Sequence, residues 1–360
     1  MIGSDLSRRL KRLCRQYAAQ VPTALTRLEL PSPRELSDEL VQQWLVDHLI
    51  NSPTPRSHAE HTETSSWSRA FWKRIVADIE LGLSLAGPDQ QPECEIHEEI
   101  LFILVRHLQT QLASTCLRRY YYGSLDPDPA CWPSVTLLED SRIISQGTTG
   151  LRSWQASIRL ANHLLAMPYL LGRATVIELG SGTGLLACLC AQLKNQDPSL
   201  GESPLIVTDL DEQVLLRLQA NVDLNDVASN VCIQKLDWCQ PELPRILPNA
   251  PKRLLILGAD IVYDPALCRP LAKCIHQLLS LSSVESGQAL IASTVRNPQT
   301  LQTFRDALSA CRLEVHERTY HQPGSDAEIV GACDEEQIGG AKSIMLEIVA
   351  RQQHYAVQST

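Results

Sequence analysis

The fold of this 360-residue chain is decided by one stretch, the sequence VIELGSGTGL at residues 176–185. Its first half is an apolar run, and three glycines then alternate with small polar residues ahead of an apolar segment of helical length. A strand that ends in such a turn lets a ligand approach the backbone closely and points the N–H groups of the next helix at it. The dinucleotide fingerprint G-x-G-x-x-G requires glycine where Leu185 stands, so the turn alone leaves open a nicotinamide cofactor, another adenosine cofactor or a purely structural turn.

From about residue 150 onward, short β-rich runs alternate with segments of helical length, which is the pattern of a parallel sheet covered by helices. We therefore predict an α/β fold with a Rossmann-like sheet of seven strands and helices on both of its faces. Only the polar, glycine-rich connection 321–341 separates the last two strands, so we expect them to form an antiparallel hairpin at the sheet edge. The predicted strands are residues 175–179, 205–209, 231–236, 254–259, 289–294, 313–320 and 343–349, and the predicted helices between them include 212–224, 265–281 and 298–311.

Residues 1–145 lack this alternation, and we predict that they form a mainly helical N-terminal domain ahead of a second domain at 146–360. The basic segment at the start of the chain is typical of an amphipathic helix that Ser4 caps, or of a mitochondrial presequence. Apolar residues at helical spacing predict three further helices, and a polar stretch predicts a loop: the helices cover about 36–49, 71–83 and 96–117, and the loop covers 51–66.

The composition argues against several classes of function. A formal charge of −9 at pH 7 weakens generic binding to nucleic acid or to an anionic membrane, because such binding draws its affinity from Lys and Arg. No apolar run approaches the ~20 residues of a membrane span. The twelve cysteines show no C-x-x-C pair and no zinc-ligand spacing, which favours a reducing, cytoplasmic compartment and argues against a metal site. A mildly acidic chain suits a basic protein surface as its partner.

Two side chains follow the second and third predicted strands, where the carboxyl edge of a parallel sheet binds ligands. Asp209 can accept hydrogen bonds from both ribose hydroxyls of an adenosine cofactor, and its structural alternative is an N-cap, a role that Asp211 can equally take. Trp238 can cover an adenine face while the neighbouring Asp237 accepts from the exocyclic amine, or Trp238 can belong to the core. Both positions favour an adenosine site at this edge.

The residues that most directly indicate the type of reaction lie at the end of the fourth predicted strand, in the sequence LGADIVYD at residues 257–264. The G-x-G-x-G turn after an acidic residue is similar to motif I of S-adenosylmethionine-dependent methyltransferases. Methyl transfer from a sulfonium to an amine requires a neutral amine held in line with the methyl group. A carboxylate holds an incoming lysine but raises the pKa of its amine, so we assign Asp260 to positioning rather than to activation, and Tyr263 to one wall of a lysine channel.

The chain as a whole resembles the seven-β-strand protein-lysine methyltransferases over about residues 145–350. The long helical N-terminal region and the run at 294–298 are similar to the branch of that family which methylates translation elongation factor 2. Five motifs in register carry the resemblance: Gly147-Thr148-Thr149-Gly150-Leu151-x-x-Trp154-x-Ala156, Glu178-Leu179-Gly180-Ser181-Gly182, Leu236-Asp237-Trp238, Ala259-Asp260-x-x-Tyr263 and Thr294-Val295-Arg296-Asn297-Pro298.

The resemblance implies S-adenosylmethionine as the cofactor, a lysine of elongation factor 2 as the substrate, and a role for each matched position. Asp260 and Tyr263 match the D-x-x-Y motif at the substrate end. The other implied positions bind the cofactor: Trp154, on a helix before the first strand, contacts it together with Gly180, Ser181 and Gly182, Trp238 covers the adenine, and Ala259 lines the methionine side.

Three other functions remain open at this stage. They are a methyltransferase of another protein substrate, a nicotinamide-dependent oxidoreductase that uses the same glycine turn, and a noncatalytic scaffold.

About 150 residues precede the part that the cofactor chemistry requires. We interpret that surplus as a substrate-recognition domain, because it carries a core of its own and a nearly balanced charge.

Overall fold

The computed structural model describes residues 2–21, 28–51, 65–85, 95–126, 128–140, 149–203, 205–241, 251–324, 326–331 and 342–350. The chain divides into two compact units. The first comprises Met1–Ser145 and Gly324–Cys333, and the second comprises Gln146–Pro323 and Asp334–Thr360. A short piece of the connection between the last two strands therefore belongs to the first unit, although both strands belong to the second.

The second unit is built around a seven-stranded sheet with the strand order β5-β4-β3-β6-β7-β9-β8. Neighbouring strands run parallel from β5 to β7, whereas β9 pairs antiparallel with both β7 and β8. This arrangement confirms the predicted Rossmann-like sheet and the predicted antiparallel hairpin at its edge. The strands are β3 (Thr175–Leu179), β4 (Leu205–Asp209), β5 (Val231–Lys235), β6 (Arg253–Ala259), β7 (Ser286–Thr294), β8 (Leu313–Arg318) and β9 (Ser343–Ala350).

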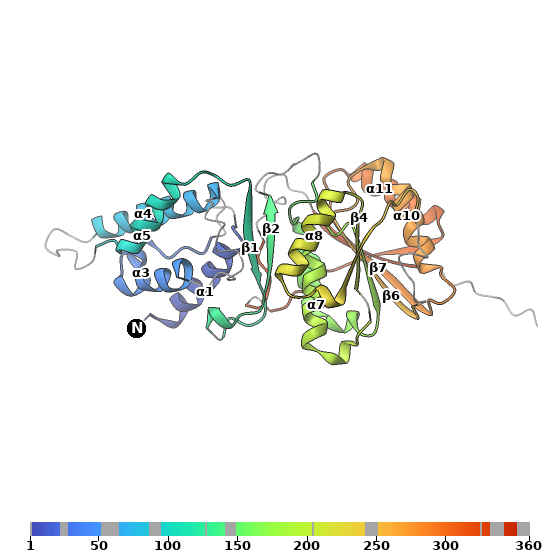
Figure 1. The fold of residues 1–360 in the computed structure, drawn as a ribbon, viewed down its shortest axis with the longest axis horizontal. Helices are drawn as coiled ribbons and strands as arrows, with labels where there is room; N and C mark the ends of the chain where they lie inside the picture. The colour runs from blue at the N-terminus through green and yellow to red at the C-terminus, as the bar shows by residue number, and fades with distance from the viewer. Residues whose placement is uncertain are drawn as a thin grey trace, which may run out of the picture. The chain divides into compact units, whose positions relative to one another are not determined.

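Helices cover both faces of this sheet, as predicted, with α7 and α8 on one face and α10 and α11 on the other (Figure 1). The helix α6 packs against α7 and against β6 and β7, and α10 and α11 pack against each other. The helices are α6 (Gln155–Ala166), α7 (Leu185–Gln196), α8 (Glu212–Leu224), α10 (Pro265–Leu279) and α11 (Pro298–Ala310), and short 3-10 turns cover Pro168–Leu171, Pro198–Leu200 and Ala228–Asn230.

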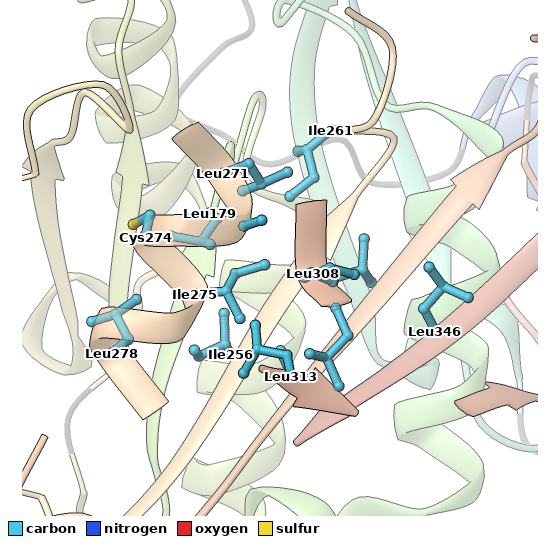
Figure 2. Close-up of a cluster of buried hydrophobic side chains, with 14 of the residues drawn as sticks. Leu179, Ile256, Ile261, Leu271, Cys274, Ile275, Leu278, Leu308, Leu313 and Leu346 are labelled. Atoms are coloured by element: carbon cyan, nitrogen blue, oxygen red, sulfur yellow. The ribbon is translucent and has the colours of Figure 1, made fainter. Parts of the chain in front are cut away.

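Apolar side chains from the sheet and from α10 and α11 form a continuous core (Figure 2). Ile256 on β6, Ile275 on α10, Leu308 on α11 and Leu346 on β9 have no exposed surface. Burial of each such side chain contributes about 1.5–3 kcal/mol, so this face of the sheet holds the strand ends at fixed positions. Ile261 belongs to the same core and lies just beyond the carboxyl end of β6. The loops at that edge are thereby anchored.

The first unit is mainly helical, but it also contains a two-stranded antiparallel sheet of β1 (Thr115–Tyr121) and β2 (Ser134–Asp140). The sequence prediction of a helix over 96–117 is wrong beyond Gln109, because α5 ends there and β1 begins six residues later. Residues 36–49 do not form one helix, because two helices begin in this region. Ser32 is the N-cap of the first, Pro33–Leu36, and Asp38 is the N-cap of the second, Glu39–Leu45. The helical elements are α1 (Ser4–Ala18), α2 (Pro33–Leu36), α3 (Glu39–Leu45), a π-helical turn (Val46–Ile50), α4 (Ser66–Ser84), α5 (Glu98–Gln109) and a 3-10 turn (Pro129–Cys131).

The basic N-terminal helix α1 serves the first unit as a structural element. Its cap is Gly3, without a side-chain hydrogen bond, so the prediction that Ser4 caps the helix is wrong. Arg8 and Arg12 both donate to the carboxylate of Asp326 at 2.7 and 2.8 Å, and Arg15 donates to the Asp326 carbonyl at 2.9 Å. The basic residues are therefore committed to contacts inside this unit, including its piece of the β8–β9 connection.

Several sequence predictions fall on residues outside the described part of the chain. These are Gly147 and Thr148, nearly all of the predicted loop 51–66, and residues 332–341 of the connection. Among the residues that the structure describes, no helix combines the length and hydropathy that a bilayer crossing requires. Within the same residues, no three His, Cys, Asp or Glu side chains gather in a way that could hold a metal ion.

Candidate active site

The glycine turn after β3 adopts a backbone that only glycine adopts without strain. Gly180, Gly182 and Gly184 have φ of +66°, +53° and +90°. A Cβ at Gly180 would stand 2.7 Å from Cγ2 of Ile261, and a Cβ at Gly184 would stand 2.5 Å from Cδ1 of Leu218. The positive φ therefore favours glycine at all three positions, and a Cβ at Gly180 or Gly184 would in addition crowd a neighbouring side chain. The turn lies at the carboxyl edge of the sheet, directly after β3.

A cavity opens at this edge, entirely within the second unit. The loops after β3, β4, β5 and β6 and the segment before α6 surround it. The structure brings together around this cavity all nine positions that the sequence singled out: Trp154, Gly180, Ser181, Gly182, Asp209, Trp238, Ala259, Asp260 and Tyr263.

Asp209 at the end of β4 faces the glycine turn. Its carboxylate accepts hydrogen bonds from the Gly182 N–H at 3.1 Å and from the Leu210 N–H at 2.8 Å. Burial raises the pKa of this carboxyl above its ordinary value, although the backbone N–H groups oppose the shift. The N-cap of α8 is Asp211, which accepts from Gln213 and Val214. Asp209 is therefore not the helix cap, and it lines the cavity instead.

Two tryptophans contribute aromatic surface to the cavity. Trp238 is partly buried against the core and also lines the cavity. It therefore has features of both roles that the sequence left open, a core residue and a wall of the ligand site. Trp154 is the residue before α6 rather than a residue on that helix, and its Nε1 donates to the Thr149 carbonyl at 3.0 Å.

Asp260 lines the cavity but is itself tied to the neighbouring strand. It has a φ of +54°, its side chain is 4% exposed, and its carboxylate accepts from the Thr294 N–H at 2.7 Å and from the Thr294 hydroxyl at 3.2 Å. The Ala156 N–H also donates to it, and Arg296 pairs with it at 3.5 Å. Asp260 thereby joins the ends of β6 and β7 to the start of α6.

These contacts give physical roles to the run at 294–298, which the sequence marked without an explanation. Thr294 and Arg296 bind Asp260, and the Arg296 guanidinium lies 5.1 Å from the centre of the Trp154 ring. Asn297 caps α11 by accepting from the Gln299 N–H, and Pro298 occupies the first helical position, where its fixed φ is favourable. The motif links the sheet edge to the cavity wall.

Tyr263 follows Asp260 by three residues and is 57% exposed, so its ring stands at the open side of the cavity. Burial of part of the ring, together with the charges of Asp209 and Asp264, raises the pKa of its hydroxyl. The phenol therefore stays protonated at neutral pH and can donate or accept a hydrogen bond. Asp264 is the N-cap of α10, where it accepts from the Ala266 N–H at 2.8 Å.

Glu178 is a cavity residue that the sequence analysis did not assign. It is 3% exposed on β3, its Oε2 has no hydrogen-bond partner, and burial raises the pKa of its carboxyl to about 8. An unpartnered carboxylate oxygen of this kind is matched by a cationic group of a ligand. The available signal was a single acidic residue inside an otherwise apolar, fully buried strand.

Replacement of Glu178 by Gln should change stability in a pH-dependent way. The folded pKa lies above the unfolded one, so the glutamate's contribution to stability is full below about pH 4.3 and is lost as pH rises towards 8. We expect Glu178→Gln to melt higher than wild type at pH 8 and by a smaller margin at pH 5. Differential scanning calorimetry of the ligand-free proteins measures both margins. A margin that is the same at both pH values would contradict the assignment.

Comparison with known proteins places the chain in a family. Residues 138–309 match the family model described as lysine methyltransferase. The protein-lysine N-methyltransferase EFM3 of Chaetomium thermophilum is 30% identical, with 83% of this chain and 86% of that protein covered. The protein-lysine N-methyltransferases EEF2KMT of Homo sapiens and Bos taurus are 31% and 26% identical, and the similarity covers 79% and 80% of this chain and 82% and 84% of those proteins.

The similarity to these enzymes runs through both units and includes the cavity with its glycine turn. It decides against the nicotinamide-dependent oxidoreductase and the noncatalytic scaffold. The cofactor is S-adenosylmethionine, as the resemblance implied. The chain belongs to the family of S-adenosylmethionine-dependent protein-lysine N-methyltransferases.

Proposed function

We propose that this enzyme methylates a lysine of translation elongation factor 2, and that the cavity at the carboxyl edge of the sheet is where it does so. The main observation behind this proposal is that three features line one cavity. They are the glycine turn, the carboxylate of Asp209 in a position that suits the ribose of an adenosine cofactor, and the D-x-x-Y pair Asp260 and Tyr263. The relatives named EEF2KMT support the substrate, and the formal charge of −9 suits a basic protein surface.

The residues around the cavity fit S-adenosylmethionine by their chemistry. The cofactor supplies a methyl group on a positively charged sulfur. Asp209 keeps acceptor capacity for ribose hydroxyls beyond the backbone N–H groups that it already binds, and Trp238 offers a ring for the adenine. Glu178 offers a buried carboxylate oxygen without a partner, which suits the ammonium group of the methionine part. The absence of a Cβ at Gly180 lets the turn lie against Ile261 and Trp238, which line the same cavity.

On the substrate side, the chain must hold a lysine amine in its neutral form and in line with the methyl group. The Trp154 and Tyr263 rings line the cavity and can enclose the aliphatic stem of a lysine, as apolar walls do for long cationic side chains. Removal from water disfavours the ammonium form and so lowers the pKa of the amine. We assign Tyr263 to the lysine channel and propose Trp154, which the resemblance gives to the cofactor, as a second wall of that channel. Asp260 positions the lysine by fixing this wall rather than by binding the ammonium, because Thr294, Ala156 and Arg296 already occupy its carboxylate.

We further propose that the first unit recognises the folded protein substrate. The cofactor cavity is lined by the second unit alone, so the first unit is free for this task. Its helix α5 exposes a row of large apolar side chains, of which Phe102 is 65% exposed and Val105 and Leu108 are 48% and 45% exposed. Such a row on the surface is typical of a protein contact, and the occupant that we propose is the protein substrate.

The double variant Phe102→Ser, Leu108→Ser should raise the KM for elongation factor 2 about 10-fold or more, because the few large side chains that dominate an interface each cost more than about 1 kcal/mol when truncated. Cofactor affinity and melting temperature should change little, since both side chains are exposed. The matched control is Leu216→Ser on α8, where an equally exposed leucine is 66% accessible in the other unit. An unchanged KM in the double variant would show that α5 does not hold the substrate.

The test of the proposed substrate is transfer from labelled S-adenosylmethionine to purified elongation factor 2, followed by identification of the labelled residue by mass spectrometry. We expect label on one lysine. A preparation that binds S-adenosylhomocysteine but labels no elongation factor 2 would refute the substrate while leaving the family membership intact. We place the reaction in the cytoplasm, since translation takes place there and the cysteines among the described residues are free thiols.

A further inference from the structure

Arg296 is the cation that faces the buried carboxylate of the D-x-x-Y pair. Its Nη2 lies 3.5 Å from Oδ2 of Asp260, while its guanidinium carbon lies 5.1 Å from the centre of the Trp154 ring. The arginine side chain is 42% exposed, whereas the aspartate side chain is 4% exposed. The charged end of Arg296 therefore bridges two residues that line the cavity, from a position on the loop after β7.

The same carboxylate is already occupied by other donors of the protein. Thr294 donates through its N–H and its hydroxyl, and the Ala156 N–H donates as well. A carboxylate that binds three protein donors and a guanidinium is neutralised and has little capacity left for an incoming ammonium. An uncompensated carboxylate in its place would bind the ammonium form of lysine and raise the pKa of its amine.

We infer that Arg296 is a positioning residue of the transferase: it compensates the charge of Asp260 and fixes the Trp154 ring, so that the target lysine meets a cavity wall that favours the neutral amine. This inference rests on the proposed placement of the lysine beside Asp260 and Tyr263. The other ionisable groups around the cavity are Glu178 on β3, Asp209 after β4, Asp237 after β5 and Arg152 before α6, and Asp264 follows Tyr263. Of these groups, Glu178, Asp209, Asp237 and Arg152 line the cavity, so the acids outnumber the arginine and an uncompensated charge on Asp260 would make the cavity still more negative.

The test compares the pH profiles of kcat/KM for wild type, Arg296→Lys and Arg296→Gln with the protein substrate. Arg296→Gln leaves Asp260 uncompensated, so the pH of half-maximal kcat/KM should rise by about one unit and the rate at pH 7 should fall about 10-fold. Arg296→Lys keeps the charge and should return the profile most of the way to wild type. S-adenosylhomocysteine affinity should stay within about 3-fold in both variants. The control Arg305→Gln breaks an ion pair with Glu317 on the same unit and should leave the profile unchanged.

Two results would overturn the inference. One is an equal loss of rate at every pH in Arg296→Gln, which indicates a structural role alone, and the other is a lysine variant no better than the glutamine variant. A second readout needs no substrate: the emission of Trp154, taken as the difference between each protein and its Trp154→Phe counterpart, should shift in Arg296→Gln and less in Arg296→Lys. If wild type labels no elongation factor 2, the proposed substrate fails, and this emission difference still decides whether Arg296 positions Trp154.

Discussion

Asp260→Asn should reduce methyl transfer by about 100-fold or more while S-adenosylhomocysteine affinity falls less than about 10-fold, because misplacement of a reacting group costs rate rather than cofactor binding. Asparagine has the shape of aspartate and tolerates the φ of +54° at this position. It removes the charge that holds Arg296 and presents an amide N–H₂ where the Thr294 hydroxyl and Arg296 donate. The contacts through which Arg296 joins Asp260 to the Trp154 ring are then lost, and the cavity wall that these two residues line is rearranged.

The measurements are single-turnover transfer and calorimetric titration of the cofactor product on the same preparation. A melting temperature within a few degrees of wild type shows that the variant is folded; the altered hydrogen bonds cost about 1–3 kcal/mol. Asp264→Asn is the matched control, because Asp264 lies one residue after Tyr263 and caps α10, a role that asparagine can also take, but it does not itself line the cavity. Parallel loss of transfer and cofactor affinity in Asp260→Asn would instead assign Asp260 to the cofactor or to the fold.

Gly180→Ala should abolish measurable cofactor binding, with a loss of affinity of about 100-fold or more. The added Cβ would stand 2.7 Å from Ile261 and 3.6 Å from Trp238, and neither a φ of +66° nor the anchored core residue Ile261 can accommodate it without a shift of the turn. Because both neighbours line the cavity, the shift falls on the ligand-binding surface. Calorimetric titration with S-adenosylhomocysteine measures the effect.

Gly123→Ala separates backbone strain from damage to the cavity. Gly123 has a φ of +80°, but its Cβ would meet only Pro133 at 3.5 Å, and it belongs to the first unit. Placing an alanine in this conformation costs about 1–2 kcal/mol, so Gly123→Ala should lower the melting temperature without changing cofactor affinity. Wild-type affinity in Gly180→Ala would mean that the turn does not approach the cofactor.

The sheet was predictable from the sequence because each strand and turn obeys local rules. The strands β3 and β4 match their predicted bounds, since an apolar run ends at Leu179 ahead of the glycine turn and another ends at Asp209. The parallel order then brings the strand ends to one edge, where Trp238 and Asp260 meet the glycine turn. Residues far apart in sequence thus line one cavity because the carboxyl ends of neighbouring parallel strands lie at the same edge of the sheet.

The contacts made by side chains across that edge were not predictable in the same way. The partners of Asp260 lie 34 and 36 residues away, on Thr294 and Arg296, and no spacing rule connects them. Likewise, the partnerless oxygen of Glu178 depends on the packing around β3, and periodicity does not report it. The sequence marked the run at 294–298, but only its position beside the cavity explains it.

The first unit shows where local rules compete. The apolar spacing over 36–49 favours one long helix, yet Asp38 accepts from the Leu40 N–H and starts a new helix there. The apolar spacing also predicts helix beyond Gln109, whereas Thr115–Tyr121 forms a strand that pairs with Ser134–Asp140. That pairing depends on a partner strand more than a dozen residues away, and a window of the length of one helix cannot detect it.

The central claim is that this enzyme modifies a lysine of elongation factor 2. The most direct measurement is mass spectrometry of elongation factor 2 isolated from cells that lack this protein and from the same cells complemented with wild type or with Asp260→Asn. We predict that methyl groups on one lysine disappear in the deletion, return with wild type and stay absent with Asp260→Asn. Elongation factor 2 that carries the same methylation in all of these cells would contradict the claim.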